Sequence, residues 1–247
     1  MFFFSLYWYL ILIVSVLCRL PLMFRLKKRA ETADPAEAEA VRREACEVAT
    51  RWTATRIKQS GTVFHVTGLE NVPEGPVVFV CNHQSMFDIG VFLALIPKPC
   101  GFVAKTEILR IPLIRTWMRL LGCVFLDRGN IRQSAQTILE GINLVKAGHS
   151  MVIFPEGHRQ SANTLGDFKA GAFKLATKSK APLVPVSVCG TRPAFEANGW
   201  QIRYGTQPRV KIHPPLETKD MTKEEEIALP EKVKEIIQKG VNELAGK

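Results

Sequence analysis

The motifs that define several large enzyme classes are missing from this sequence of 247 residues. It contains no Gly-x-x-x-x-Gly-Lys phosphate loop, no Gly-x-Gly-x-x-Gly dinucleotide fingerprint and no His-Glu-x-x-His metal motif. It also lacks the Gly-x-Ser-x-Gly elbow that presents the nucleophile of many hydrolases. Internal repeats and low-complexity linkers are absent as well. These absences argue against a P-loop enzyme, a dinucleotide-dependent enzyme, a zinc peptidase and a repeat protein.

The cysteines are scattered, and their spacing gives no sign of a metal site. The six cysteines stand at positions 18, 46, 81, 100, 123 and 189, with no Cys-x-x-Cys pair and no zinc-like spacing to histidine. Cys81 and Cys123 fall within predicted strands, where we expect them to be reduced, buried and small apolar residues in a reducing compartment. The sequence predicts no metal site.

Charge is absent from residues 1–18, which are apolar and aromatic. The first charge is Arg19, and a basic block follows at positions 25, 27, 28 and 29. A secretory signal has positive charge before its apolar run and a small-residue cleavage site after it, and neither is present. We therefore expect a membrane anchor at the inner membrane, with the rest of the chain on the cytoplasmic face. Eighteen residues reach roughly 27 Å against a hydrocarbon core of about 30 Å, so a spanning helix and a helix held in one leaflet both remain open.

A second helix is predicted from about residue 34 to 58. Val41, Ala45, Val48 and Trp52 recur at spacings of three and four residues, and Pro35 suits a first helical turn. This amphipathic helix lies either on the bilayer or on the body of the protein. We expect residues 1–59 to form membrane-associated helices and residues 60–247 to form the catalytic domain.

The remaining chain alternates between strand and helix patterns. Predicted strands cover residues 62–66, 77–81, 101–104, 123–126, 151–154 and 183–188, and a final strand pair covers 200–204 and 210–213. Helical patterns cover residues 131–146, 167–179 and 230–244. Such alternation predicts an α/β fold with a mostly parallel sheet flanked by helices.

The turn after the strand at 77–81 carries His83, and Asp88 follows five residues later, in the first turn of a helical pattern. A neutral imidazole with a carboxylate folded back beside it is the arrangement that a general base needs. A second interpretation gives Asp88 no catalytic role, because Ser85-x-x-Asp88 also matches a helix capping box, in which Asp88 bonds only to backbone N–H groups. The cap explains Asp88 but leaves His83 unexplained.

Two further polar clusters also follow predicted strands. Asp127-Arg128 comes after residues 123–126, and Pro155-Glu156-Gly157-His158-Arg159 comes after 151–154. The carboxyl ends of parallel strands line a common crevice, so we expect these clusters to lie beside His83. Arg128 and Arg159 then offer forked donors to a phosphate, with Lys105 among the groups that add positive potential. Gly157 permits close approach of a ligand, and Glu156 either holds an arginine or binds a substrate hydroxyl.

Four blocks of sequence together resemble the glycerolipid acyltransferase family. They are Asn82-His83-Gln84-Ser85-Met86-Phe87-Asp88, Gly122-Cys123-Val124-Phe125-Leu126-Asp127-Arg128, Phe154-Pro155-Glu156-Gly157-His158-Arg159 and Leu183-Val184-Pro185-Val186. The resemblance covers about residues 60–215 and is closest to the bacterial 1-acylglycerol-3-phosphate acyltransferases, which make phosphatidic acid. One departure is visible, since His158 stands where members usually have threonine.

The resemblance implies roles for particular residues. It makes His83 and Asp88 a catalytic dyad, and it makes Arg128, Glu156, Gly157 and Arg159 determinants of the acceptor phosphate. It also implies an acyl thioester donor, either acyl-CoA or acyl-carrier protein, with lysophosphatidate as acceptor and no metal or other cofactor. The expected reaction is direct transfer of the acyl group to the 2-hydroxyl of lysophosphatidate.

The net charge of +10 and the pI near 9.5 predict an anionic partner. We expect a phospholipid surface and no nucleic acid, because the basic residues lack the interleaved aromatics of a strand-binding platform. Acylation of glycerol 3-phosphate or of another lysophospholipid is the nearest alternative. A lipid-surface hydrolase and a non-enzymatic binder of anionic lipid are the alternatives from other classes, and the second leaves the His83–Asp88 pair without a use.

Overall fold

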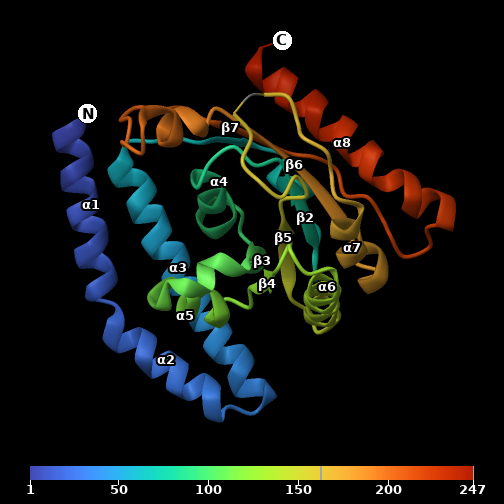
Figure 1. Cartoon of the computed structure of the whole chain (residues 1–247), viewed down its shortest axis with the longest axis horizontal. Helices are drawn as coiled ribbons and strands as arrows, with labels where there is room; N and C mark the ends of the chain where they lie inside the picture. Colours follow the sequence, from blue (N-terminus) through green and yellow to red (C-terminus); the bar gives the residue numbers. More distant parts are fainter. Residues whose placement is uncertain (162, 247) are drawn as a thin grey trace.

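The computed structural model describes residues 1–161 and 163–246, and its centre is one seven-stranded sheet (Figure 1). The strands are β1 (His65–Thr67), β2 (Val78–Cys81), β3 (Cys100–Lys105), β4 (Val124–Leu126), β5 (Ser150–Ile153), β6 (Leu183–Cys189) and β7 (Arg209–Ile212). Their order is β1-β7-β6-β2-β5-β3-β4, and every neighbouring pair is parallel except β6 with β7. The predicted α/β fold with a mostly parallel sheet is confirmed.

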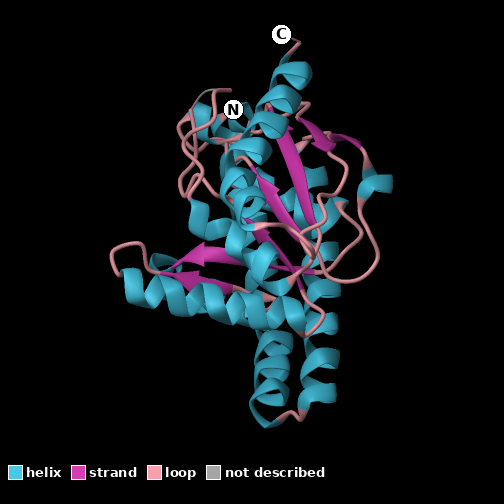
Figure 2. Cartoon of the chain, turned by 90° about the vertical axis from the view of Figure 1, so that its right-hand side faces the viewer, coloured by secondary structure: helices cyan, strands magenta, loops and turns pink. Residues whose placement is uncertain are grey.

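Helices cover both faces of this sheet. They are α1 (Phe2–Leu17), α2 (Leu20–Thr32), α3 (Pro35–Ser60), α4 (Phe87–Gly90), α5 (Pro112–Leu120), α6 (Ile131–Lys146), α7 (Lys174–Ser179) and α8 (Lys223–Ala245). A π-helical turn, Val91–Leu95, continues α4. Figure 1 shows α1, α2 and α3 on one side and α6, α7 and α8 on the other, and Figure 2 shows the strands between the helices.

The pleat of β2 explains why two separate cores form. Phe79 and Cys81 belong to one hydrophobic cluster, with residues of α2, α3 and the π-helical turn, while Val78 and Val80 belong to a second cluster with α6, α7 and α8. Successive side chains of a strand point to opposite faces, so a continuous apolar run is buried on both sides. Because β2 is central and fully buried, the turn that follows it leaves from a fixed position.

Local signals in the sequence set the ends of three predicted helices. The Asp34 side chain accepts a hydrogen bond from the backbone N–H of Glu37, Pro35 begins α3, and Gly61 ends it in the left-handed conformation. The predicted helix 131–146 has the same bounds as α6, which the Asn130 side chain caps. The predicted helix 230–244 is part of α8, but α8 begins at Lys223 because Thr222 and Glu225 form a capping box there.

Three sequence predictions about elements were wrong or only partly right. Residues 200–204 form no strand, because the backbone N–H of Ile202 donates to Ser5 Oγ of α1, and β7 pairs with β1 and β6 instead. The predicted helix 167–179 is helical only from the 3₁₀ turn Ala170–Phe173 onward, because the backbone N–H of Lys169 donates to the Pro155 carbonyl. The first strand, predicted at 62–66, is His65–Thr67.

The N-terminal helices pack against the body. Val41, Ala45 and Cys46 of α3 and Met23 and Leu26 of α2 are buried in the same cluster as Phe79, so α3 lies on the body of the protein. Among the described helices, none alone has the length and apolar composition to cross a membrane; α1 and α2 meet both conditions only as a pair, with a bend of 43° between them. The division of the chain at residues 59 and 60 stays a prediction.

Candidate active site

His83 and Asp88 are in direct contact beyond the carboxyl end of β2. His83 Nδ1 lies 2.9 Å from Asp88 Oδ2. The Asp88 side chain has no exposed surface, whereas the His83 side chain is 16% exposed. Within residues 1–161 and 163–246, no group forms a hydrogen bond with His83 Nε2, so the second ring nitrogen is the one that can meet a substrate. The geometry is the one that the sequence predicts for a base and its orienting carboxylate.

Asp88 also closes the turn that carries His83. Its Oδ2 accepts hydrogen bonds from the backbone N–H groups of Gln84 and Ser85, at 2.7 and 2.8 Å. Its Oδ1 accepts one from the Thr191 hydroxyl at 2.6 Å. The bond from the Ser85 N–H is one half of the predicted capping box. The other half is missing, because Ser85 Oγ accepts from the Phe87 N–H instead. Asp88 therefore holds both the turn and the imidazole.

Two more contacts fix the His83 ring and the end of β2. The ring stacks on Phe154, with 4.2 Å between ring centroids and 22° between planes. The Asn82 side chain bonds to both the N–H and the carbonyl of Val188, at 2.8 and 2.9 Å, and so ties the end of β2 to β6. These contacts leave the imidazole little freedom to rotate.

Glu156 lies beneath the turn and not inside the site. It is 1% exposed. Its Oε1 accepts a hydrogen bond from the His83 N–H at 2.9 Å, and its Oε2 accepts one from the Gly166 N–H at 2.8 Å. The sequence predicts that Glu156 holds an arginine or binds substrate. The buried carboxylate supports the backbone of His83, and among the described residues no arginine bonds to it. Its role toward a substrate stays a prediction.

Arg128 extends from the loop after β4 to the turn after β5. The Arg128 side chain is exposed, and its guanidinium covers Gly157 so closely that a Cβ there would lie 3.6 Å from Arg128 Cζ. Gly157 has a φ of 78°, which a residue with a side chain adopts only with strain. The predicted meeting of these two clusters is therefore present in the structure.

Lys105 stands at the end of β3, where it is paired in register with Leu126 of β4, and it is exposed. The pKa of Glu107 shows that the electrostatic potential around Lys105 is positive. A hydrogen bond from its own backbone lowers the pKa of Glu107, and the charges of Lys105, Arg128 and Arg110 lower it further. Positive charge thus extends from the end of β3 to the loop after β4.

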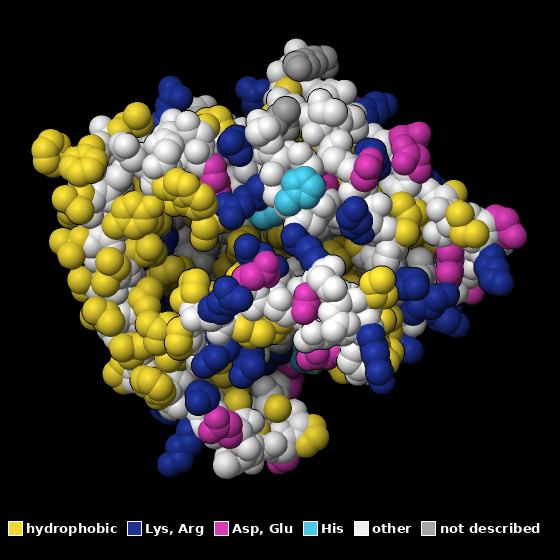
Figure 3. Space-filling view, viewed as in Figure 1, with side chains coloured by type: hydrophobic (Ala, Val, Ile, Leu, Met, Phe, Trp, Pro, Cys, Tyr) yellow, Lys and Arg dark blue, Asp and Glu magenta, His cyan; other side chains and the backbone are white. Residues whose placement is uncertain are grey.

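Arg159 lies on the other side of the turn. Its Nη1 donates to Glu196 Oε1 at 2.7 Å, and its guanidinium carbon lies 5.5 Å from the centre of the Trp200 ring. Figure 3 shows Lys and Arg side chains gathered around histidine atoms near the middle of this face, and a hydrophobic band on the side where α1 lies. Sequence reasoning missed Glu196 and Thr191, because both come from the irregular segment after β6.

Cys81 is the last residue of β2, two residues before His83. Cys81 is fully buried, and this burial raises the pKa of its thiol well above the ordinary value. Across residues 1–161 and 163–246, no three side chains of His, Cys, Asp or Glu are grouped as a metal ion would require.

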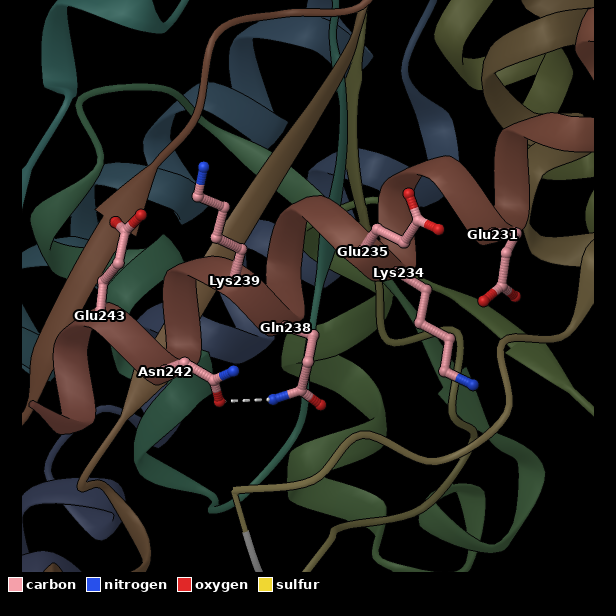
Figure 4. A pocket seen from close by; sticks show the side chains of 7 residues that line it. All are labelled: Glu231, Lys234, Glu235, Gln238, Lys239, Asn242 and Glu243. Atoms are coloured by element: carbon pink, nitrogen blue, oxygen red, sulfur yellow. Dashed lines mark hydrogen bonds between the residues drawn. The ribbon is translucent and has the colours of Figure 1, made fainter. Parts of the chain in front are cut away.

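A hollow on the exposed face of α8 is not part of this site. Figure 4 shows the side chains that line it, among them Lys234, Gln238 and Glu243, all from one helix. Gln238 accepts from the Leu165 N–H and donates to the Asn163 carbonyl, so it braces the loop after β5. None of the lining residues comes from the carboxyl end of a strand.

A base with its carboxylate, at the carboxyl edge of a parallel sheet and among arginines, is the arrangement of an enzyme that uses general-base catalysis. The model of the acyltransferase family matches residues 63–189, and the chain belongs to that family.

Its relatives carry more specific names. It is 39% identical over 153 residues, 61% of this chain and 44% of the relative, to the chloroplastic 1-acyl-sn-glycerol-3-phosphate acyltransferase BAT2 of Brassica napus. It is 34% identical over 177 residues, 69% of this chain and 57% of the relative, to the 1-acyl-sn-glycerol-3-phosphate acyltransferase of Saccharomyces cerevisiae. The chain spans about half the length of such curated relatives. The crystal structure of the acyltransferase PlsC from Thermotoga maritima matches with a TM-score of 0.81 at 28% identity, covering 100% of this chain and 96% of that one.

Proposed function

We propose that this enzyme transfers a fatty acyl group from an acyl thioester to the 2-hydroxyl of 1-acylglycerol 3-phosphate, and so makes phosphatidic acid. The observation that carries the proposal is the contact of 2.9 Å between His83 Nδ1 and Asp88 Oδ2, which leaves Nε2 without a hydrogen-bond partner among the described residues. The names of the relatives support the choice of acceptor.

In the proposed mechanism His83 acts first as a base and then as an acid. Nε2 takes the proton from the acceptor hydroxyl, while Asp88 stabilises the imidazolium through Nδ1. The oxygen attacks the thioester carbonyl, an oxygen–carbon bond forms, and the carbon–sulfur bond breaks. The imidazolium then gives its proton to the leaving thiolate. Base catalysis of this kind contributes about 10²–10⁴-fold, and positioning contributes much of the rest.

The transfer is direct in this proposal, with no acyl-enzyme. Cys81 is fully buried at the end of β2, its thiol donates to the Asn82 carbonyl at 3.1 Å, and the sequence has no serine in a nucleophile elbow. The donor is acyl-CoA or acyl-carrier protein, with no metal or other cofactor. An acyl group trapped on Cys81 or on a serine during turnover would contradict direct transfer.

The acceptor phosphate is proposed to bind between Arg128, Lys105 and Arg159, close to the backbone of Gly157. Two of these side chains are planar guanidinium forks, which suit phosphate oxygens. The exposure of Arg128 and its position over Gly157 support this assignment, because a glycine leaves the backbone beside the guanidinium uncovered by a side chain.

Membrane attachment is proposed through α1 and the basic residues of α2. The outward face of α1 consists of large hydrophobic side chains, each about half exposed or more: Phe2, Phe3, Leu6, Tyr7, Leu10, Ile13, Val14 and Leu17. The basic block at residues 25–29 of α2 suits an anionic lipid surface. We place the enzyme at the cytoplasmic face of the inner membrane, where its lysolipid acceptor resides.

The test is an assay of the full chain with lysophosphatidate and with glycerol 3-phosphate, each against acyl-CoA and acyl-carrier protein. We expect acylation of lysophosphatidate by at least one donor and much slower acylation of glycerol 3-phosphate. His83→Ala should lose about 10²–10⁴-fold in kcat with lysophosphatidate binding retained. The control is His65→Ala, at an exposed position on β1, which should keep full activity. Preferential acylation of glycerol 3-phosphate, or release of free fatty acid without acceptor, would refute the proposal.

A further inference from the structure

The segment between β6 and β7 lies against the catalytic turn. Its second residue, Thr191, donates its hydroxyl hydrogen to Asp88 Oδ1. Five residues later Glu196 opens a 3₁₀ turn, Glu196–Asn198, and its carboxylate reaches the same backbone from the opposite side. This segment contains none of the predicted site residues.

Glu196 makes three hydrogen bonds, all to the surroundings of His83. Its Oε2 accepts from the Ser85 hydroxyl at 2.6 Å, and its Oε1 accepts from the Met86 N–H at 2.9 Å. The same Oε1 accepts from Arg159 Nη1 at 2.7 Å. The Glu196 side chain is 7% exposed, against 31% for Arg159, so these bonds form largely out of water.

With Glu196, four consecutive backbone N–H groups of the turn each meet a carboxylate. The N–H of His83 donates to Glu156, those of Gln84 and Ser85 donate to Asp88, and that of Met86 donates to Glu196. A buried N–H without a partner costs about 1–3 kcal/mol, so each carboxylate stabilises this one backbone conformation. Glu196 is the only one of the three carboxylates whose hydrogen bonds also include an arginine, among the residues that the structure describes.

The N-terminal helix holds the Glu196 segment in place. The Tyr9 hydroxyl of α1 donates to the Trp200 carbonyl at 2.8 Å, and the N–H of Ile202 donates to Ser5 Oγ at 2.9 Å. Burial raises the pKa of the Tyr9 phenol, and the nearby charge of Glu196 adds to that effect. The segment is therefore fixed at one end by Asp88 and at the other by α1.

We propose that Glu196 is a positioning residue, which fixes the distance between the His83 turn and Arg159 so that the acceptor hydroxyl meets the base while the phosphate meets the guanidinium. This inference rests on the proposed function and deepens it. It predicts that removal of the Glu196 hydrogen bonds changes both turnover and acceptor binding and leaves donor binding unaffected.

The test compares Glu196→Ala with Glu196→Gln. Alanine removes all three bonds. Glutamine keeps a carbonyl oxygen for the Met86 N–H and for Arg159 Nη1, and its amide N–H can donate to the Ser85 hydroxyl oxygen. We expect Glu196→Ala to lower kcat and raise the KM for lysophosphatidate, each by about tenfold, with the donor KM unchanged. Glu196→Gln should restore both parameters to within about threefold of the wild type.

A double-mutant cycle with Arg159→Ala separates positioning from general damage. If Glu196 acts on the acceptor through Arg159, Glu196→Ala should raise the acceptor KM much less in the Arg159→Ala background than in the wild type. If the two substitutions raise the acceptor KM by independent factors, so that the double variant shows their product, the proposal is overturned. Glu243→Gln is the matched control. It changes a carboxylate of α8 that pairs with Lys211 of β7, and it should alter neither kcat nor the acceptor KM.

Hydrogen exchange gives a readout that needs no activity. The amide of Met86 should exchange faster in Glu196→Ala and at the wild-type rate in Glu196→Gln, because only alanine removes its acceptor. Unchanged exchange in Glu196→Ala, or equal defects in both variants, would refute the role of Glu196. Failure of the wild-type chain to acylate lysophosphatidate would refute the proposed function instead, with the exchange result still deciding whether Glu196 holds the turn.

Discussion

At the scale of single residues, the most consequential feature is how completely the turn at residues 83–86 is bonded. Its four N–H groups all donate to carboxylate oxygens of Glu156, Asp88 and Glu196. An oxyanion hole is usually made of backbone N–H groups that lack protein partners. These four have partners, so in the proposed mechanism the negative oxygen that develops on the thioester carbonyl is stabilised by groups outside this turn. The turn serves to hold His83.

Arg128 is the residue whose proposed role is simplest to test, because its side chain is exposed and its loss leaves no buried group unpaired. We expect Arg128→Ala to raise the KM for lysophosphatidate by about tenfold, since a hydrogen bond to a charged group is worth about 1.5–3 kcal/mol, with the donor KM unchanged. Steady-state kinetics with each substrate varied measures both. Arg51→Ala, at a side chain of α3 that is 73% exposed, is the control. An equal loss with a lysolipid that lacks phosphate would show that Arg128 is not a phosphate ligand.

How well a contact in the site could be predicted depends on how far apart its two residues lie in the sequence. His83 and Asp88 are five residues apart, so a local pattern predicts their contact, although the same pattern also allows Asp88 to act only as a helix cap. Thr191 and Glu196 lie more than 100 residues from Asp88 and Ser85, which they bind, in a segment without helix or strand periodicity. Glu156 belongs to a recognisable sequence motif, but its burial depends on the position of β5 between β2 and β3. Motif chemistry could therefore be predicted from sequence, while the supporting contacts could not.

At the scale of elements, the sequence predicts best where a local signal sets each end. The helices α3 and α6 have side-chain caps at their first turns, and both were predicted closely. The strand expected at 200–204 shows the opposite case. Its residues alternate between apolar and polar, but tertiary contacts prevent a strand. The Ser5 and Tyr9 side chains of α1 form hydrogen bonds with the Ile202 N–H and the Trp200 carbonyl.

The outward face of α1 allows a test of membrane attachment that keeps the helix. Leu6 and Leu10 are 58% and 59% exposed and touch little of the body, whereas Ser5 and Tyr9 on the other face bind the Glu196 segment. We expect the double variant Leu6→Glu, Leu10→Glu to lose vesicle binding, because each buried leucine contributes about 1.5–3 kcal/mol and a charge adds a penalty. Co-sedimentation with anionic vesicles measures the loss.

The control for this variant is Ile227→Glu, at a side chain of α8 that is 78% exposed, which should sediment like the wild type. Circular dichroism checks that the double variant remains folded. Retained sedimentation of a folded double variant would assign the attachment to α2 or to the body. Deletion of the helix would be less informative, since it would also remove the partners of Trp200 and Ile202.

At the scale of the whole molecule, the site exists because of strand order. Three strands, β2, β5 and β4, end in the polar clusters that the sequence identified, and their parallel directions bring those ends to one edge of the sheet. The alternation of strands and helices predicts such an edge. It does not predict that β5 inserts between β2 and β3, which is what places Glu156 under His83 and Gly157 under Arg128.

The same sheet is joined to α8 through a buried histidine, far from the reacting groups in the fold. His213 follows β7, is 7% exposed, and lies 2.8 Å through Nε2 from Ser187 Oγ of β6, which donates to the Ile237 carbonyl of α8. Helix and sheet approach closely here, since a Cβ on Gly240 would lie 2.6 Å from His213 Nε2. Burial, aided by the charge of Lys211 and opposed by that of Glu243, lowers the pKa of His213 from 6.5 to about 4.

This pKa predicts acid sensitivity of the whole fold. Between pH 6.5 and 4 the unfolded chain takes up a proton on this histidine and the folded chain does not, so stability is complete above pH 6.5 and falls as the pH drops toward 4. We expect the wild type to lose on the order of 1–2 kcal/mol of unfolding free energy between pH 7 and 4.5 from this group, after discounting for partial solvation. Urea unfolding at both pH values measures it. His213→Gln should be less stable at pH 7 yet lose less on acidification, and the exposed His65→Gln should keep the wild-type difference between the two pH values. An identical loss in His213→Gln and the wild type would show that the junction of α8 with the sheet does not depend on a neutral imidazole.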